Sequence, residues 1–192
     1  MTDTLTKLFG SAARVKLLRL FLFNPRQSLT AAAATTRARV KPADAKREIS
    51  LLVRLGILER HPRERGARYQ ISQNSPYVPA LQNLLLNAPA RSNEIHERLR
   101  STGNLKLVVV SGIFAGEWDS SLDLLVVGDR IKENALQHKI KMLEAEVGKE
   151  VRFAAMSTPD FFYRLNMSDR LLRDIFDYPH RIIYDRLDIG LK

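Results

Sequence analysis

The pattern of apolar and polar residues is clearest between Pro42 and Gly56, where apolar side chains recur at helical spacing. Pro42 suits the first position of a helix, because its missing N–H would find no intrahelical partner there and its φ angle is preset. Gly56 is suited to ending that helix. The face predicted to be buried carries Ala45, Ile49, Leu52 and Val53. The opposite face, predicted to be exposed to solvent, carries Asp44, Lys46, Arg47 and Ser50.

A pair of short strands is predicted directly after this helix. Residues 57–60 and 67–72 are expected to form them, separated by a basic hairpin tip that contains a proline and a glycine. Two helices are expected upstream, over residues 4–23 and, more weakly, over the alanine-rich residues 28–36, with residues 37–39 as the turn into the third. This order of elements is typical of a winged helix-turn-helix domain: helix, helix, turn, helix, strand, hairpin and strand.

The net charge of +10 arises in the N-terminal part of the chain. Residues 1–75 contain 15 lysines and arginines against five acidic residues, whereas residues 76–192 contain 16 of each. A basic surplus confined to one segment favours a polyanionic partner for that segment, most often nucleic acid. A solvated basic surface would give the same composition, so it is the order of the predicted elements that favours nucleic acid.

The winged-helix pattern also suggests which residues contact DNA. In such a domain the exposed side of the recognition helix enters the major groove, while flanking basic groups contact phosphates. The candidates for base edges are Asp44, Lys46, Arg47 and Ser50. The candidates for phosphates are Arg37, Arg39, Lys41, Arg63, Arg65 and Arg68. Any one of them could instead be a solvated surface group. The pattern predicts salt-sensitive binding of duplex DNA and does not indicate an operator sequence.

A helical connector is expected between two domains. Asn74-Ser75-Pro76 marks the end of a first domain of residues 1–75, and residues 76–103 form the connector. Helices are expected over residues 77–86 and 93–100, with a break at residues 88–90. A leucine stripe on the connector is expected to pack against the first domain or against a second subunit: Leu81, Leu84 and Leu85.

A small mixed α/β domain is predicted over residues 104–192. Two continuously apolar strands, 107–110 and 122–127, are expected to be buried on both faces, and an amphipathic helix over residues 131–147 follows them. Gly148 ends this helix. The remaining expected elements are a strand over residues 150–156, helices over 158–165 and 168–176, and a strand over 181–184. The fold class expected for the whole chain is α+β with two domains.

Residues 110–129, with the sequence VSGIFAGEWDSSLDLLVVGD, resemble the signature of the nucleotidyltransferase superfamily, the polymerase-beta-like fold. In that family a Gly-Ser turn after the first strand holds nucleotide phosphates. An Asp-x-Asp motif opening the second strand and a later carboxylate hold two divalent metals. The chain also resembles proteins that join an N-terminal winged helix to such a domain. This likeness spans nearly the whole chain, from residues 8–14 through residues 55–58 to the tail at residues 157–184.

The chain departs from that signature where phosphate and metal would bind. Ser111-Gly112 replaces Gly-Ser, Ser121 replaces the first aspartate, and Arg152 stands where the third strand would supply a carboxylate. Asp123 alone matches, and a hard cation needs several anionic oxygens. Ser111, Gly112, Ser121, Asp123 and Arg152 are therefore interpreted as a degenerate nucleotide site, with no catalytic residue and no metal. Asp123 is expected to pair with Arg152 or to cap a turn.

These observations together predict a DNA-binding protein, in which a winged helix binds duplex DNA and a non-catalytic nucleotidyltransferase-like domain serves in assembly or sensing. Transcriptional regulation is the expected role. A homodimer is compatible with this role, no cofactor is expected, and nucleotide binding stays open. The alternatives are a metal-dependent nucleotidyltransferase acting on protein, RNA or a small molecule, a structured-RNA binder, and a protein-interaction adaptor.

The composition also bears on location. No apolar run reaches the ~18 residues of a membrane span. The first residues lack the charged and apolar regions of a signal peptide. The chain has no cysteine, which is compatible with a reducing compartment. We therefore expect a cytoplasmic protein that has no membrane partner.

Overall fold

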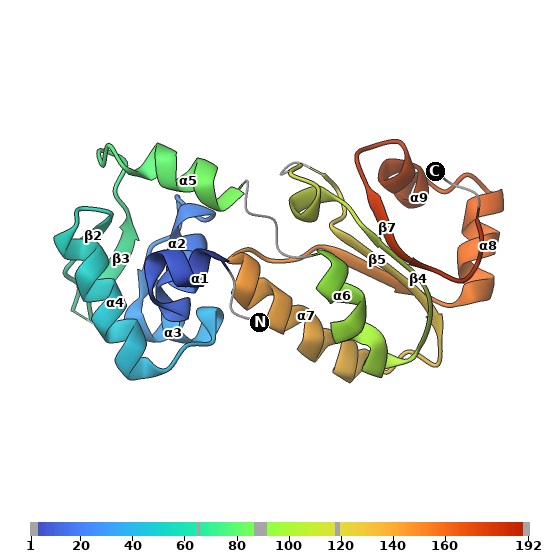
Figure 1. Cartoon of the computed structure of the whole chain (residues 1–192), viewed down its shortest axis with the longest axis horizontal. Helices are drawn as coiled ribbons and strands as arrows, with labels where there is room; N and C mark the ends of the chain where they lie inside the picture. Colours follow the sequence, from blue (N-terminus) through green and yellow to red (C-terminus); the bar gives the residue numbers. More distant parts are fainter. Residues whose placement is uncertain (1–3, 65, 87–91, 118–119, 190–192) are drawn as a thin grey trace. The chain divides into compact units, whose positions relative to one another are not determined.

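The computed structural model describes residues 4–64, 66–86, 92–117 and 120–189 (Figure 1). The chain is a mixed α+β protein with two separate sheets, as the sequence predicts. Its contacts divide it into two compact units. The first unit comprises residues 1–88 and 142–150, and the second comprises residues 89–141 and 151–192.

The first unit packs helices against a small antiparallel sheet. Its strands run in the order β1-β3-β2, and both neighbouring pairs are antiparallel. The helix predicted to start at Pro42 and the two strands after it are all present. In chain order the elements are α1 (Thr4–Phe9), α2 (Ala12–Leu22), β1 (Leu29–Thr30), α3 (Ala31–Ala38), α4 (Pro42–Arg54), β2 (Leu58–His61), β3 (Arg68–Ile71) and α5 (Val78–Leu86).

The single helix predicted over residues 4–23 is wrong, because α1 and α2 are separate. Gly10 has a φ of +70°, which a helix interior does not allow, and Ser11 starts the next helix. The Ser11 hydroxyl oxygen accepts a hydrogen bond from the Arg14 backbone N–H at 3.2 Å. Apolar spacing does not reveal the break, since Leu5 of α1 and Val15 of α2 are both buried in the same core.

The helix predicted over residues 28–36 starts later than expected. Leu29 and Thr30 form β1, which pairs with β3, and the Thr30 side chain then caps α3 by accepting a hydrogen bond from the Ala33 N–H at 3.1 Å. The turn predicted over residues 37–39 is also displaced, because α3 continues to Ala38. Arg39 ends it in the left-handed conformation, with a φ of +48°.

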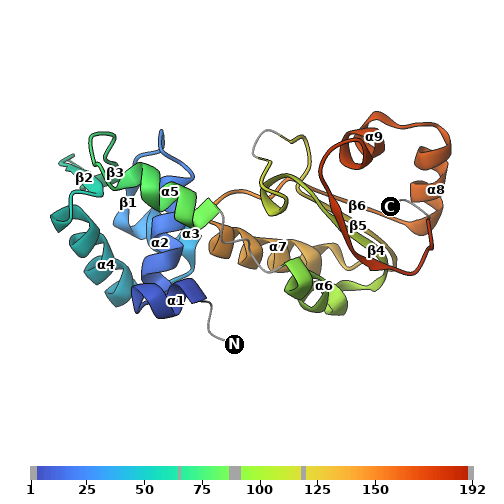
Figure 2. The same cartoon turned by 45° about the horizontal axis from the view of Figure 1, so that its top comes forward.

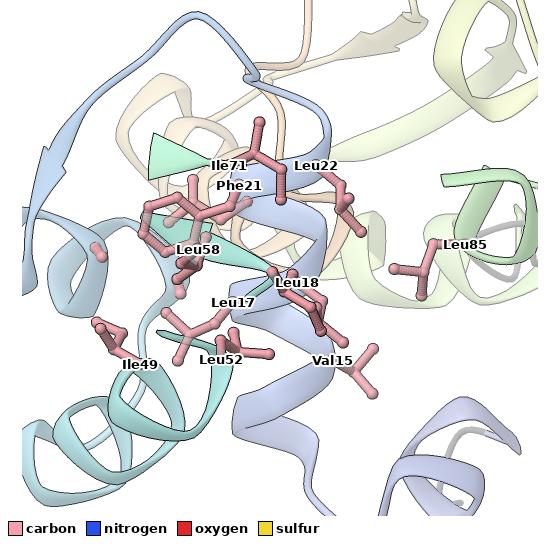
Figure 3. Packing of buried hydrophobic residues seen from close by; sticks show 14 of the residues in the cluster. Val15, Leu17, Leu18, Phe21, Leu22, Ile49, Leu52, Leu58, Ile71 and Leu85 are labelled. Carbon is pink, nitrogen blue, oxygen red and sulfur yellow. The ribbon is translucent and has the colours of Figure 1, made fainter. Parts of the chain in front are cut away.

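Helix α2 forms the centre of the first unit's core. Leu17, Leu18 and Phe21 are each at most 2% exposed. Figure 3 shows Ile49 of α4 and Leu85 of α5 on opposite sides of α2. Burying a side chain of this size stabilises a fold by about 1.5–3 kcal/mol, so the packing against α2 helps to hold α4 in place.

Residues 142–150 group with the first unit, although the sequence analysis assigned them to the second domain. The Arg19 guanidinium of α2 donates to the Glu146 carbonyl oxygen at 3.0 Å, and the Asn24 side-chain amide donates to the Gly148 carbonyl oxygen at 2.7 Å. Gly148 has a φ of +81°, and a Cβ on it would lie 2.4 Å from the backbone of Arg19. A glycine is therefore required where this segment passes α2.

The second unit is built on a four-stranded sheet in the order β6-β5-β4-β7. Strands β5 and β6 are parallel, and the other two pairs are antiparallel. The elements predicted here are present, with ends displaced by a few residues. In chain order this unit contains α6 (Ser92–Leu99), η1 (Arg100–Thr102), β4 (Asn104–Val110), η2 (Gly112–Phe114), β5 (Leu124–Asp129), α7 (Glu133–Val147), β6 (Phe153–Met156), α8 (Thr158–Asn166), α9 (Arg170–Phe176) and β7 (Arg181–Asp185), of which η1 and η2 were not predicted.

Both faces of the two central strands are buried, as their continuous apolar runs predict. Val109 of β4 and its partner Leu125 of β5 pack in one cluster with Phe161 of α8 and Leu172 of α9. Figure 2 shows α6 and the first part of α7 along the other face of the sheet.

The break predicted at residues 88–90 lies outside the described residues. Among the helices of the described ranges, none is long and apolar enough to span a membrane.

Candidate functional site

Helix α4 presents the polar face that the sequence predicts. Ala45, Ile49 and Leu52 are at most 2% exposed, while Lys46, Arg47 and Ser50 are exposed on the opposite side. The Asp44 side chain is half-buried. A helix with one face in the core and the other in solvent can present its outer side chains to a partner without losing its packing.

Arg47 is not a free cation on this face. Its guanidinium lies 2.9 Å from the Asp44 carboxylate and 3.3 Å from the Glu48 carboxylate. Lys46, one residue earlier, has no ion-pair partner within the described ranges. The positive charge on the outer face of α4 therefore comes from Lys46 and, in the last turn, from the exposed Arg54, while the charge of Arg47 is largely compensated.

Glu48 is a functional candidate that the sequence analysis missed. Its side chain is only 1% exposed, and its carboxylate accepts a hydrogen bond from Arg14 Nε of α2 at 2.8 Å. Arg14 also donates to the Phe9 carbonyl oxygen at 2.7 Å, so this one side chain joins the end of α1 to α2 and α4. The sequence does carry a signal for it, since Glu48 falls on the apolar stripe between Ala45 and Ile49.

The environment of Glu48 lowers the pKa of its carboxyl below the ordinary value of 4.5. Burial alone would raise this pKa, but hydrogen bonds from Arg14 and Ser11 and the positive charge of Arg14 outweigh burial. A group whose pKa is lowered by folding stabilises the protein above its unfolded pKa. That contribution is lost as the pH falls through the folded pKa.

The Glu48→Gln variant is therefore expected to be less stable than wild type by about 2 kcal/mol near neutral pH, because the buried ion pair with Arg14 is lost. The difference is expected to shrink as the pH falls below 4.5 and through the lowered pKa of the folded protein, where the wild-type carboxyl also becomes protonated. Urea unfolding of both proteins over a pH series measures it. A difference that stays constant from neutral to acid pH would contradict the assignment.

The predicted phosphate contacts lie on three elements around α4. Lys41 precedes its first turn, Arg37 is on α3, Arg39 follows α3, and Arg63 is on the β2–β3 hairpin. All are exposed, and Arg65 lies outside the described residues. A hollow between the hairpin and the start of α3 brings two of the candidates, Arg63 and Arg68, together; it is lined by Thr30, Pro62, Arg63, Glu64, Gly66 and Arg68.

Three of these arginines are held by neighbours within the first unit. Arg37 donates to the Gln27 side chain at 2.5 Å, and Arg39 contacts the Met142 sulfur at 2.7 Å. Arg68 donates to the Ser28 carbonyl and hydroxyl oxygens. Because these neighbours are neutral, the three positive charges remain available to an anion.

The residues predicted to form a degenerate nucleotide site lie around Asp123, which is fully buried. Its Oδ2 accepts hydrogen bonds from the Arg152 backbone N–H at 2.8 Å and from Arg152 Nε at 2.9 Å. Its Oδ1 accepts from Arg152 Nη2 at 2.8 Å and from the Ile113 N–H at 3.0 Å. The predicted pairing and capping of a turn are both confirmed. Arg152, however, precedes β6 and does not lie on it, because that strand starts at Phe153.

Gly112 completes this arrangement. It has a φ of +51°, and a Cβ on it would lie 2.1 Å from Asp123 Oδ1, so the turn can approach the carboxylate only with glycine here. The two serines are directed elsewhere: Ser111 donates to the Pro179 carbonyl oxygen at 3.2 Å, and Ser121 donates to the Asp174 carboxylate at 3.4 Å. The structure thus brings together Gly112, Asp123 and Arg152, but not the hydroxyls of the two serines.

Comparison of the chain with protein-family models, with curated proteins and with solved structures finds no match.

The chemistry that the two sites offer is different. On α4 and the elements around it, exposed cations and a hydroxyl face solvent, an arrangement suited to an extended polyanion. At Asp123, both carboxylate oxygens are already engaged by Arg152 and by backbone N–H groups. Among the described residues, no group of three or more histidine, aspartate or glutamate side chains could hold a metal ion.

Proposed function

We propose that the first unit is a winged helix-turn-helix domain that binds duplex DNA through α4. The observation that carries this proposal is the outer face of α4, where Lys46 and Ser50 are exposed on a helix whose inner face is fixed in the core. The order of the neighbouring elements supports the proposal, since only three residues separate α3 from α4 and the β2–β3 hairpin follows α4 directly. This is the arrangement in which a recognition helix enters the major groove.

The contacts suggest a division of roles. Lys46 and Ser50 are the residues best placed to reach base edges, since Arg47 is held by Asp44 and Glu48. Cations on the flanking elements supply phosphate contacts, which position the domain and provide most of the salt-sensitive affinity. These cations are Arg37, Arg39, Lys41, Arg63 and Arg68.

Duplex DNA is favoured over duplex RNA by the shape of the presenting element. A helix fits the wide major groove of B-form DNA, whereas the major groove of A-form RNA is deep and narrow. A protein that uses α4 as its leading surface is therefore expected to bind DNA in preference to RNA duplexes. Transcriptional regulation in the cytoplasm is the role we propose for such a protein.

For the second unit we propose a nucleotidyltransferase-like fold that no longer catalyses transfer and serves in assembly or sensing. The support is the state of Asp123, whose two oxygens accept four hydrogen bonds from Arg152 and Ile113. A two-metal mechanism requires several carboxylate oxygens that are free to bind cations. Arg152 opposes the binding of a cation at Asp123 in two ways. Its positive charge repels the cation, and its hydrogen bonds engage the carboxylate oxygens that would bind the cation.

The Lys46→Glu variant is expected to bind random-sequence duplex DNA about tenfold more weakly than wild type at low salt, because a favourable contact is replaced by charge repulsion. Fluorescence anisotropy with a labelled duplex measures this. Lys132→Glu in the second unit makes the same change of charge at an exposed lysine and serves as the control. Equal losses of affinity in the two variants would show that α4 has no special part in DNA binding. In a competition experiment, an unlabelled RNA duplex that displaces the labelled DNA as well as unlabelled DNA does would favour the RNA-binding alternative.

A further inference from the structure

A histidine and an arginine lie opposite each other in the β2–β3 hairpin. His61 ends β2 and is paired with Arg68, the first residue of β3. Residues that face each other across an antiparallel pair have Cβ atoms about 4.5–5.5 Å apart. Arg63 follows His61 by two residues and lines a hollow together with Arg68. His61 is therefore next to both of the hairpin arginines that we propose as phosphate contacts.

The side chain of His61 lies on the outer face of the hairpin. Successive side chains of a strand point to opposite faces, and Leu58 of β2 is buried in the core, so Glu59 and His61 point away from it. Their contact agrees with this, since His61 Nε2 lies 3.7 Å from a carboxylate oxygen of Glu59. Both side chains are 45% exposed. An anion in solvent can therefore reach the imidazole.

The charged groups around His61 belong to β2 and to the elements packed against it. On β2, the Glu59 carboxylate accepts a hydrogen bond from the Ser72 hydroxyl at 2.7 Å, which holds it beside the imidazole. Strand β3 contributes Arg68, and α4 carries Arg54 in its last turn. The other charged residues described in the hairpin are Arg60, Arg63 and Glu64. On the outer face, the charge of Glu59 offsets that of Arg68, so protonation of His61 gives this face a net positive charge.

We propose that His61 is a further phosphate contact of the hairpin, made only by its protonated imidazole, so that affinity for DNA rises as the pH falls from about 8 to about 5.5. Histidine ordinarily changes its charge within this range, and both of its ring nitrogens donate hydrogen bonds once it is protonated. Protonation and DNA binding then strengthen each other. This inference rests on the proposed function, because it adds a residue and a pH response to the same surface.

The distribution of titratable groups assigns such a response to His61. Of the four histidines in the chain, His61 alone belongs to the first unit. The pKa of the Glu48 carboxyl is lowered below 4.5, so the ion pair between Glu48 and Arg14 persists throughout this pH range. A change of DNA affinity between about pH 8 and about pH 5.5 therefore does not arise from loss of that ion pair.

Fluorescence anisotropy with a labelled random-sequence duplex at about pH 8 and about pH 5.5 tests the proposal. Wild type is expected to bind about fivefold more tightly at the lower pH, with a salt slope larger by about 0.9, because one more cation contacts a phosphate. His61→Gln is expected to lose most of this rise. His138→Gln makes the same change at an exposed histidine of the second unit, and this control is expected to behave as wild type.

A second variant leaves His61 in place. Glu59→Gln removes a negative charge beside the proposed contact, so it is expected to bind DNA more tightly than wild type at both pH values and to keep a rise at the lower pH. If Glu59→Gln instead shows no rise, His61 acts only by neutralising Glu59, and the phosphate contact is overturned.

The outcomes separate this inference from the proposed function. A wild type without affinity for duplex DNA at low salt at either pH would contradict the proposed function itself. Binding at the higher pH that does not strengthen at the lower pH would overturn the role of His61 and leave DNA binding by α4 intact. A rise of the same size in His61→Gln as in wild type would do so too.

Discussion

Replacing Arg152 by alanine is expected to lower the free energy of unfolding of the second unit by about 3 kcal/mol. The substitution removes two hydrogen bonds from the guanidinium to Asp123, whose carboxylate is fully buried. The backbone N–H groups of Ile113 and residue 152 would still donate to the carboxylate, but a buried carboxylate without a countercharge is strongly disfavoured. The value lies at the lower end of the usual range because the Arg152 side chain is 37% exposed, so water can partly replace it.

Two variants test this explanation. Arg170→Ala removes an exposed arginine, also from the second unit, whose contact with Asp174 is 4.0 Å long, and is expected to change stability by no more than about 0.5 kcal/mol. Adding Asp123→Asn to Arg152→Ala removes the buried charge and is expected to recover part of the loss. Urea unfolding can be followed by far-UV circular dichroism. A loss in Arg152→Ala no larger than in Arg170→Ala would contradict the buried pair.

The sequence predicts those helices and strands whose own residues mark them, through their apolar pattern and the residues at their ends. Helix α4 is marked by Pro42 at its start, by apolar residues at helical spacing and by Gly56 just beyond its end. Strands β4 and β5 are marked by uninterrupted apolar runs, which are typical of strands buried on both faces. The pairing of Asp123 with Arg152 was predicted because the resemblance placed the two residues at one site.

The remaining features depend on contacts between distant residues. Arg14 and Glu48 are 34 positions apart, and Ser111 and Pro179 are 68 apart, so no local pattern could show these partners. The break at Gly10 was missed for a different reason. Its backbone angle interrupts the helix, whereas the apolar side chains on either side of it continue into one core.

If the first unit binds DNA as proposed, its affinity for duplex DNA is expected to depend strongly on salt concentration. Each phosphate neutralised by a lysine or arginine releases counterions, so the logarithm of the association constant falls with the logarithm of salt concentration by about 0.9 per contact. The exposed cations on and around α4 suggest about five such contacts, a slope near 4.5 and a loss of roughly several hundredfold between about 50 and 200 mM salt. They are Arg37, Arg39, Lys41, Arg63 and Arg68.

The charge-reversal variants refine this prediction. Lys46→Glu is expected to lower the affinity for some sequences more than for others and to leave the slope near the wild-type value, because Lys46 is proposed to contact a base edge. A slope lower by about 0.9, with affinity lost about equally for all sequences, would assign Lys46 to a phosphate instead. The Lys132→Glu control is expected to leave the slope unchanged.

The most direct test of the central claim is the affinity of the wild-type protein for random-sequence duplex DNA at a series of salt concentrations. Binding by the outer face of α4 and its basic surroundings predicts tight binding at low salt and a linear fall of log K with log salt. No measurable affinity for duplex DNA at low salt, or an affinity that does not change with salt, would contradict it.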